Sequence, residues 1–104
     1  MKDILFDLNN IRLEVSFKSF EEVVDRANNN DLGLCSYIYT NSMDQANRAS
    51  ELMETGTVAV NTAAVAVAEA PFGGIKQTGY GREGGSSAIK DYLNVKYTHL
   101  GLKI

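Results

Sequence analysis

Glycine is concentrated in one short stretch of this chain, and no other feature restricts the fold so strongly. Six of the nine glycines lie between Gly73 and Gly85, shortly after Pro71, which is the only proline. Glycine loses more backbone entropy on folding than any other residue, so a regular helix or strand would be costly here. We therefore expect a loop whose backbone takes turns that a Cβ forbids, or approaches another group very closely.

Length and composition limit the possible classes of protein. A chain of 104 residues has room for one domain, and 44% hydrophobic with 22% charged residues is ordinary for a globular protein. The net charge of −3, without a basic patch, disfavours a nucleic-acid partner. No apolar run approaches the roughly 20 residues of a membrane span, and Asp3 and Asp7 interrupt the first apolar stretch, which excludes a signal peptide. One cysteine excludes an internal disulfide, and together these properties fit a cytoplasmic protein.

The hydrophobic patterns of the first sixty residues predict an α/β unit. Period-two alternation and short apolar runs predict three strands, the second of them buried, at about 11–17, 32–40 and 57–61. Helical stripes between them predict one helix capped by Ser19 and another capped by Asn41 or Ser42. Gly56 is expected just past the C-terminus of the second helix. The order predicts two consecutive βαβ crossovers, and therefore a parallel sheet.

The last forty residues are less regular. Ala and Val dominate residues 62–70, and propensity leaves their conformation open. A third helix is expected to begin at Ser86 or Ser87, after the glycine-rich loop. Apolar alternation then predicts a final strand over residues 94–100.

The loop contains a literal G-x-G-x-x-G, from Gly79 to Gly84. A dinucleotide site of this type needs a strand immediately before the motif, a helix immediately after it, and an acidic residue about 20 positions further on. The last clear strand ends near Asn61, and position 101 is a glycine. We therefore favour a turn-rich loop with a tight backbone, and a free nucleotide-binding loop is the alternative.

Three other residues carry chemistry that must be weighed. Cys35 lies in a predicted strand among apolar neighbours, where a packed cysteine fits better than a reactive thiolate. His99 is the only histidine and has no indicated nucleophile, so we interpret it as structural or exposed, and no metal-site spacing exists. Arg82 could orient a ligand, but we favour a role in locking the loop by pairing with the backbone or a neighbouring charge.

From about Phe17 to Leu100, the sequence resembles the C-terminal part of the aldehyde dehydrogenase superfamily. The resemblance rests on stretches in the family's order and spacing: 19–28 followed by 33–34, then 56–61, then 71–84 with 91–93 and 96–97 behind it. The PFGG-K-TG-GREG pattern, followed by a tyrosine and a lysine, is similar in particular to the succinate-semialdehyde dehydrogenase group.

This resemblance implies a fold and a division of the chain. Residues 15–104 would form a partial C-terminal unit of an aldehyde dehydrogenase catalytic domain. That unit would contain a short parallel sheet with flanking helices and a projecting C-terminal strand used in oligomerisation. Residues 1–14 do not match, because Leu5–Arg12 lacks the Glu-x-Phe-Gly-Pro-type motif of the family. A truncated chain, a gene remnant with a new start, and one piece of a split enzyme would all have this pattern.

The resemblance also implies an activity. Family members oxidise aldehydes to carboxylic acids with NAD or NADP: a cysteine thiolate attacks the aldehyde, hydride passes to the nicotinamide, and a glutamate activates water. That cysteine and that glutamate belong to upstream motifs, as does most of the Rossmann domain. We therefore assign no catalytic, cofactor-binding or metal residue here. We expect no cofactor and no activity for the chain alone, and an aldehyde substrate only together with the upstream domains.

Two residues carry over as substrate-side positions. Phe72 matches an aromatic residue that borders the aldehyde tunnel. Ala66 lies five residues before Pro71, where succinate-semialdehyde dehydrogenases commonly have a serine that helps to hold the substrate carboxylate. The resemblance further implies a homo-oligomer formed through the C-terminal strand. The alternative function is a non-catalytic module for self-association or subunit interaction.

Overall fold

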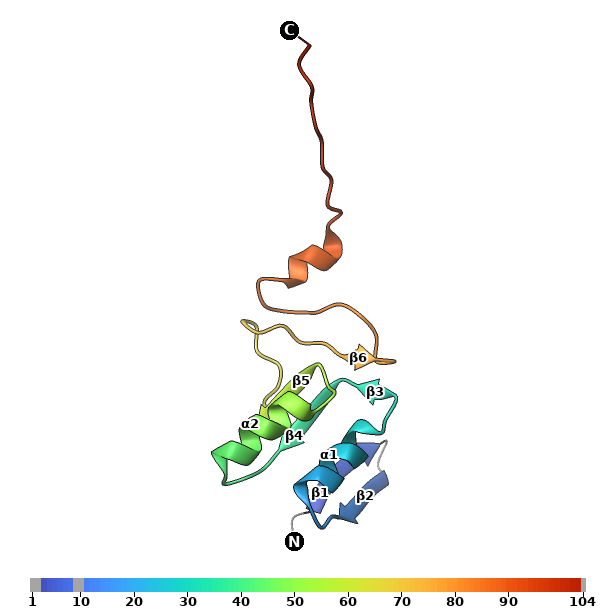
Figure 1. The fold of residues 1–104 in the computed structure, drawn as a ribbon, viewed down its shortest axis with the longest axis vertical. Coiled ribbons are helices and arrows are strands. Elements are labelled where there is room, and N and C mark those ends of the chain that lie inside the picture. Colours follow the sequence, from blue (N-terminus) through green and yellow to red (C-terminus); the bar gives the residue numbers. More distant parts are fainter. Residues whose placement is uncertain (1–2, 9–10, 104) are drawn as a thin grey trace.

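The computed structural model describes residues 3–8 and 11–103, with side chains from Ser16 onward. The elements are, in chain order, β1 (Asp3–Leu8), β2 (Ile11–Ser16), α1 (Phe20–Asn28), β3 (Leu32–Gly33), β4 (Cys35–Ile38), α2 (Met43–Leu52), β5 (Thr57–Val60), β6 (Ile75–Lys76) and the 3₁₀ helix η1 (Ala88–Tyr92). Figure 1 shows the body of the chain, formed by α1, α2 and the strands, with η1 and the C-terminal tail extending away from it.

Both α-helices begin at serine caps. The Ser19 hydroxyl accepts a hydrogen bond from the Glu22 backbone N–H at 3.1 Å, and the Ser42 hydroxyl accepts one from Gln45 at 3.3 Å. Each cap satisfies one of the backbone donors that a helix leaves free in its first turn. The prediction that Gly56 follows α2 directly is wrong, because the helix ends at Leu52 and an extended Met53 is its C-cap.

The sheet prediction is half correct. β4 and β5 pair in parallel, with Cys35 opposite Thr57 and Ile38 opposite Val60, and α2 forms the crossover between them. The other expected crossover, from the strand at 11–17 to the strand at 32–40, is wrong: β2 pairs antiparallel with β1, a strand from the segment that sequence patterns left unassigned. The described residues therefore form a parallel pair and two antiparallel pairs, in place of one short parallel sheet.

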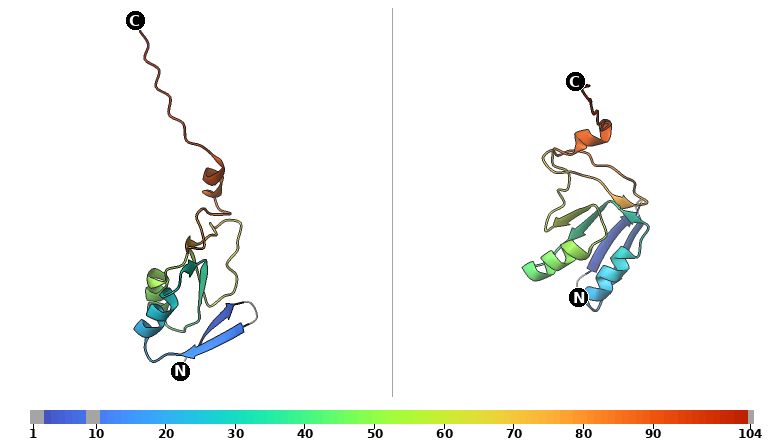
Figure 2. Two further views of the ribbon diagram at one scale, coloured as in Figure 1. Left: turned by 90° about the vertical axis from the view of Figure 1, so that its right-hand side faces the viewer. Right: turned by 45° about the horizontal axis from the view of Figure 1, so that its top comes forward.

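The predicted strand at 32–40 is divided at Leu34. β3 pairs with β6 of the glycine-rich segment, whereas β4 pairs with β5, so the two halves have different partners. The stretch is also not buried as expected, because Leu34, Tyr37 and Tyr39 are 41%, 47% and 62% exposed. An apolar run predicts burial only where both faces are covered, and the helices lie on one side of β4 and β5 (Figure 2).

The core of the described chain is built from small side chains between the helices and β5. The buried apolar residues are Val24, Ala46, Ala49 and Ala59. The Arg48 guanidinium lies over the Phe20 ring at 4.5 Å and connects α2 to α1 from the outside. Alanine at these positions lets the helices and the strand approach closely.

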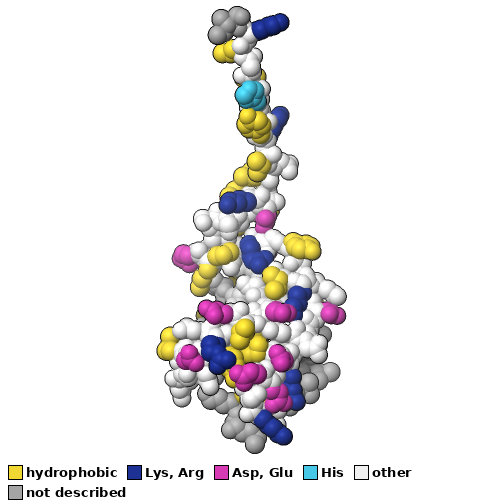
Figure 3. Space-filling model, in the orientation of Figure 1, with side chains coloured by type: hydrophobic (Ala, Val, Ile, Leu, Met, Phe, Trp, Pro, Cys, Tyr) yellow, Lys and Arg dark blue, Asp and Glu magenta, His cyan; other side chains and the backbone are white. Residues whose placement is uncertain are grey.

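The C-terminal segment projects from the body (Figure 3). The molecule measures 76 × 32 × 25 Å and has a radius of gyration of 19.0 Å, against about 13 Å for a compact chain of this length. The sequence predicts a strand over residues 94–100, but within the described chain these residues have no strand partner. The third helix is present, but as the short 3₁₀ helix η1. None of the helices in the described ranges is long and apolar enough to cross a membrane.

Candidate functional site at the glycine-rich loop

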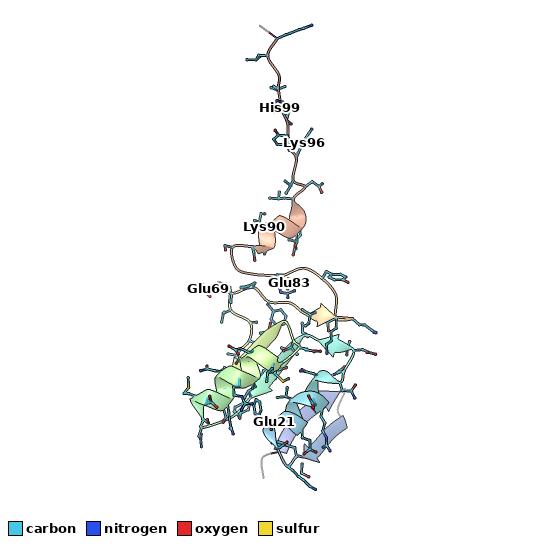
Figure 4. All side chains as sticks on the ribbon, viewed as in Figure 1. Glu21, Glu69, Glu83, Lys90, Lys96 and His99 are labelled. Carbon is cyan, nitrogen blue, oxygen red and sulfur yellow. The ribbon has the colours of Figure 1, made fainter. Side chains whose placement is uncertain are left out.

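The glycine-rich loop, residues 71–85, closes on itself through a two-way backbone bridge. The Phe72 N–H donates to the Glu83 carbonyl at 2.7 Å, and the Glu83 N–H donates back to Phe72 at 2.8 Å. Gly85 donates to the Ala68 carbonyl at 2.9 Å, which ties the end of the loop to the segment before it. Figure 4 shows Glu83 between the body and η1. The bridge fixes the backbone of Phe72.

Left-handed backbone explains the spacing of the glycines. The φ angles of Gly79, Gly81, Gly84 and Gly85 are 113°, 90°, 67° and 62°, a region that residues with a side chain rarely adopt. A two-residue strand, β6, precedes the G-x-G-x-x-G run, and the next helix is the five-residue η1. A dinucleotide cradle joins a longer strand directly to an α-helix, so these two short elements favour a turn-rich loop over a nucleotide site.

The loop is fitted against the turn before β5. A Cβ built on Gly56 would lie 1.9 Å from the Gly73 carbonyl oxygen, and one on Gly33 would lie 2.8 Å from the Glu54 carbonyl oxygen. These distances are too short for any side chain, so backbone lies directly on backbone. Gly56 is therefore needed for packing against the loop, and not for ending α2.

Lys76 attaches the loop to the end of α1. Its ammonium group donates to the carbonyls of Asn28 and Asn30 at 2.7 and 3.0 Å and forms an ion pair with Glu54 at 2.6 Å. A cation is favourable at the C-terminus of a helix, where the unpaired carbonyls point outward. The Asn28 amide also donates to the Leu52 carbonyl at 2.7 Å, so the ends of both α-helices meet at this point.

Arg82 pairs with the backbone, as favoured from the sequence. Its Nη1 donates to the carbonyls of Gly74 and Gly81, both at 2.8 Å. Its backbone N–H donates to the Asp91 carboxylate at 2.7 Å, which joins the loop to η1. The guanidinium therefore holds together parts of the loop that are separated in sequence.

The two predicted substrate-side residues lie in different environments. Phe72 is half-buried and lines an open hollow of about 370 Å³, together with Tyr80, Arg82 and Tyr92. Ala66 is exposed in the segment between β5 and the loop and does not line that hollow. In the described chain, Phe72 thus has a defined place in a concave surface, whereas Ala66 stays a candidate on sequence grounds alone.

Cys35 and His99 show no catalytic arrangement in the described residues. Cys35 is half-buried on β4, and its thiol donates to the Tyr37 hydroxyl at 3.5 Å, an interaction that raises the pKa of Tyr37 together with partial desolvation. His99 is exposed on the tail, with its Nδ1 3.1 Å from the Tyr97 hydroxyl. No group of three metal-ligating side chains occurs within the described ranges.

Sequence reasoning missed the contacts that hold the loop in place. Lys76 and Asn28 are 48 positions apart, and Asn28 reads as one of several polar residues that end a helix. From the sequence one could see only that a lysine can bind the carbonyls at a helix C-terminus. Lysines and helix ends are too common for this to identify Asn28 as the partner of Lys76. Only the fold brings these groups together.

This chain is similar to known proteins over most of its own length. The sequence profile of the Aldehyde dehydrogenase family matches residues 12–98. The 3-sulfolactaldehyde dehydrogenase of Pseudomonas putida is 52% identical over 82% of this chain and 18% of its own length. The NADP-dependent succinate-semialdehyde dehydrogenase GabD of Escherichia coli is 42% identical over 83% of this chain and 18% of its own length.

Solved structures agree with the sequence matches. An aldehyde dehydrogenase from Brucella melitensis superposes on 79% of this chain with a TM-score of 0.76 and 45% identity, over 17% of its own length. An NAD⁺ complex of the Bacillus cereus enzyme superposes on 84% with a TM-score of 0.78 and 40% identity, over 18% of its own length. The chain thus spans less than a fifth of the length of these relatives.

Proposed function

Because the chain belongs to the aldehyde dehydrogenase family, we propose that it forms the C-terminal, substrate-side part of an NAD(P)-dependent enzyme of the succinate-semialdehyde dehydrogenase type. The supporting observation is the closed loop at residues 71–85, which holds Phe72 at the edge of a hollow. The nucleophilic cysteine and the general base would come from outside this segment. The chain alone is then inactive and binds no cofactor.

We propose that the substrate is an aldehyde with an acidic group at its far end. Relatives of this chain are named for aldehydes of this kind, including 3-sulfolactaldehyde, succinate semialdehyde and glutarate semialdehyde. Ala66 lacks the hydroxyl that the resemblance implies for carboxylate binding. Loss of one hydrogen bond to a charged group costs about 1.5–3 kcal/mol, so we expect succinate semialdehyde to be a weakened substrate.

A chimera tests the proposal. Residues 12–98 of this chain would replace the matching segment of the Pseudomonas putida 3-sulfolactaldehyde dehydrogenase, and NAD(P)H formation would be followed with sulfolactaldehyde, succinate semialdehyde and an uncharged aldehyde of similar length. We expect activity on the acidic aldehydes in the chimera and none in the 104-residue chain alone. Oxidation by the isolated chain, or a folded chimera that prefers the uncharged aldehyde, would contradict the proposal.

The Ala66→Ser substitution in the same chimera tests the substrate residue. If position 66 faces the substrate acid, the added hydroxyl should lower the KM for succinate semialdehyde by about tenfold or more and leave kcat almost unchanged. Ala64→Ser, two residues away in the same exposed segment, is the matched control. Equal effects of the two substitutions would remove Ala66 from the candidate site.

The projecting tail supports a second candidate function, a non-catalytic module for self-association or subunit interaction. Residues 93–103 are exposed and carry apolar side chains that include Val95 and Tyr97, 102% and 83% exposed. An extended segment with free backbone groups is a template for pairing with another strand. The two functions are compatible, since an enzyme of this type can also associate through its C-terminus.

A further inference from the structure

The side chain of Arg82 occupies the interior of the glycine-rich loop. One nitrogen, Nη1, donates to the Gly74 carbonyl in the first half of the loop, called the first limb, and to the Gly81 carbonyl in the second half, called the second limb. Both distances are 2.8 Å. Arg82 is itself half-buried. Hydrogen bonds from a charged donor are stronger than neutral ones, and these two add a side-chain link beside the Phe72–Glu83 bridge.

The backbone of the first limb is shaped to accommodate this arginine. A Cβ on Gly73 would lie 2.7 Å from Cδ of Arg82 and 2.6 Å from the Gly81 carbonyl oxygen. Real Cβ atoms do not come so close to other atoms, so any other residue at position 73 would displace the arginine or the limb that it binds. The glycine and the arginine therefore form a fitted pair.

Arg82 also lies next to the bridge that fixes Phe72. The following residue, Glu83, exchanges backbone hydrogen bonds with Phe72 at 2.7 and 2.8 Å, and Asp91 accepts the Arg82 backbone N–H at 2.7 Å. Main-chain contacts thus hold the second limb at residues 82 and 83, while the Arg82 side chain holds the first limb two residues beyond Phe72. The Arg82 side chain is therefore connected to Phe72 by a short path of hydrogen bonds and adjacent backbone.

We propose that Arg82 is a positioning residue that sets Phe72 in the wall of the hollow by clamping the two limbs of the loop. The clamp is a property of the chain itself, and its consequence for the substrate rests on the proposed function. In this role, Arg82 acts through Phe72 and does not bind the acidic group of the substrate.

Hydrogen exchange in the 104-residue chain tests the clamp directly. In Arg82→Ala we expect the backbone N–H groups of Phe72 and Glu83 to exchange at least about tenfold faster, because two charge-assisted bonds are lost. Exchange in the β4–β5 pair should be unchanged, since its hydrogen bonds do not involve the loop. Added methylguanidinium should restore part of the protection at Phe72, which a merely general loss of stability would not allow.

Two further variants keep the test decisive. Arg82→Lys retains the charge but has a single nitrogen on a differently shaped stem, so we expect partial protection of the Phe72 N–H from exchange. If Arg82→Ala also loosens β4–β5, the Arg82→Lys variant decides whether the clamp exists. Gly73→Ala should reproduce the Arg82→Ala pattern with the arginine present, because the added methyl takes its space. Unchanged exchange at Phe72 in Arg82→Lys and Gly73→Ala would overturn the proposal.

The chimera separates this proposal from the proposed function. In an active chimera, Arg82→Lys should raise KM for acidic and uncharged aldehydes alike, because the wall is displaced. A rise confined to the acidic aldehydes would instead indicate direct binding by Arg82 and overturn the positioning role. If the chimera is inactive while exchange at Phe72 responds as expected, the result contradicts the proposed function and still supports the clamping role of Arg82.

Discussion

The side chain of Asn61 continues the hydrogen bonding between β4 and β5 beyond the end of their backbone ladder. Asn61 follows β5 with a φ of 55°, and its side-chain amide exchanges two hydrogen bonds of 2.9 Å with the backbone of Thr40, just beyond β4. The side chain therefore replaces the next rung of the parallel ladder. Asparagine suits this place because it tolerates the left-handed region better than other residues with a Cβ.

Replacing Asn61 separates the two contributions. We expect Asn61→Ala to lower the free energy of unfolding by about 3 kcal/mol, because it removes two hydrogen bonds and leaves an alanine in a left-handed conformation. Asn61→Gly, which relieves the conformational part, should cost about 1 kcal/mol less. Urea unfolding followed by circular dichroism measures both. Equal losses would show that the hydrogen bonds alone explain the choice of asparagine.

At the scale of elements, an ion pair on the outer surface supplements the packed core between α1 and α2. The Arg48 guanidinium lies 3.2 Å from the Glu21 carboxylate and also covers the Phe20 ring. A backbone hydrogen bond at Glu21, followed by the Arg48 contact, lowers the pKa of the Glu21 carboxyl below its ordinary value. The ionised Glu21 carboxylate therefore adds a small contribution to the helix contact, beside the packing of Arg48 on Phe20.

The sign of the resulting pH dependence follows from this direction. A carboxyl whose pKa is lower in the folded state stabilises the fold above its unfolded pKa, and this contribution is lost as the pH falls through the folded pKa. We expect the unfolding midpoint in urea to decrease on acidification in this range. Glu21→Gln should flatten the dependence, whereas Glu51→Gln, on an exposed residue of α2, is the control. An unchanged slope in Glu21→Gln would exclude the contribution.

The contrast between predicted and missed elements has a physical cause. Ser19 and Ser42 were identifiable because a helix cap depends on residues three positions apart, and the β4–α2–β5 crossover follows from local periodicity. The division at Leu34 was not identifiable, because it depends on β3 finding β6 more than forty residues away. Phe72 and Ala66 came from family resemblance, while the Lys76 and Arg82 contacts required the folded loop.

At the scale of the whole molecule, the chain consists of a body and a tail with opposite properties. In the body, the glycine-rich loop is held by backbone hydrogen bonds and by the cationic side chains of Lys76 and Arg82, which donate to backbone carbonyls. The tail, residues 93–103, exposes apolar side chains such as Val95 and Leu100 to solvent, together with the polar Lys96 and His99 that Figure 4 labels. An extended, exposed apolar segment is suited to pairing with another strand, so any association of the chain is best tested at the tail.

We expect the 104-residue chain to self-associate through residues 93–103 by adding a strand to a second copy. Val95→Pro should abolish association, because proline removes a backbone N–H donor and is excluded from paired strand positions. Val95→Thr keeps both the N–H and the β-branched shape, so its association should match that of the unchanged chain. Sedimentation velocity over a range of concentrations measures the three proteins side by side. A chain that sediments as a monomer at every concentration, or a Val95→Pro variant that associates as strongly as Val95→Thr, would contradict pairing through the tail.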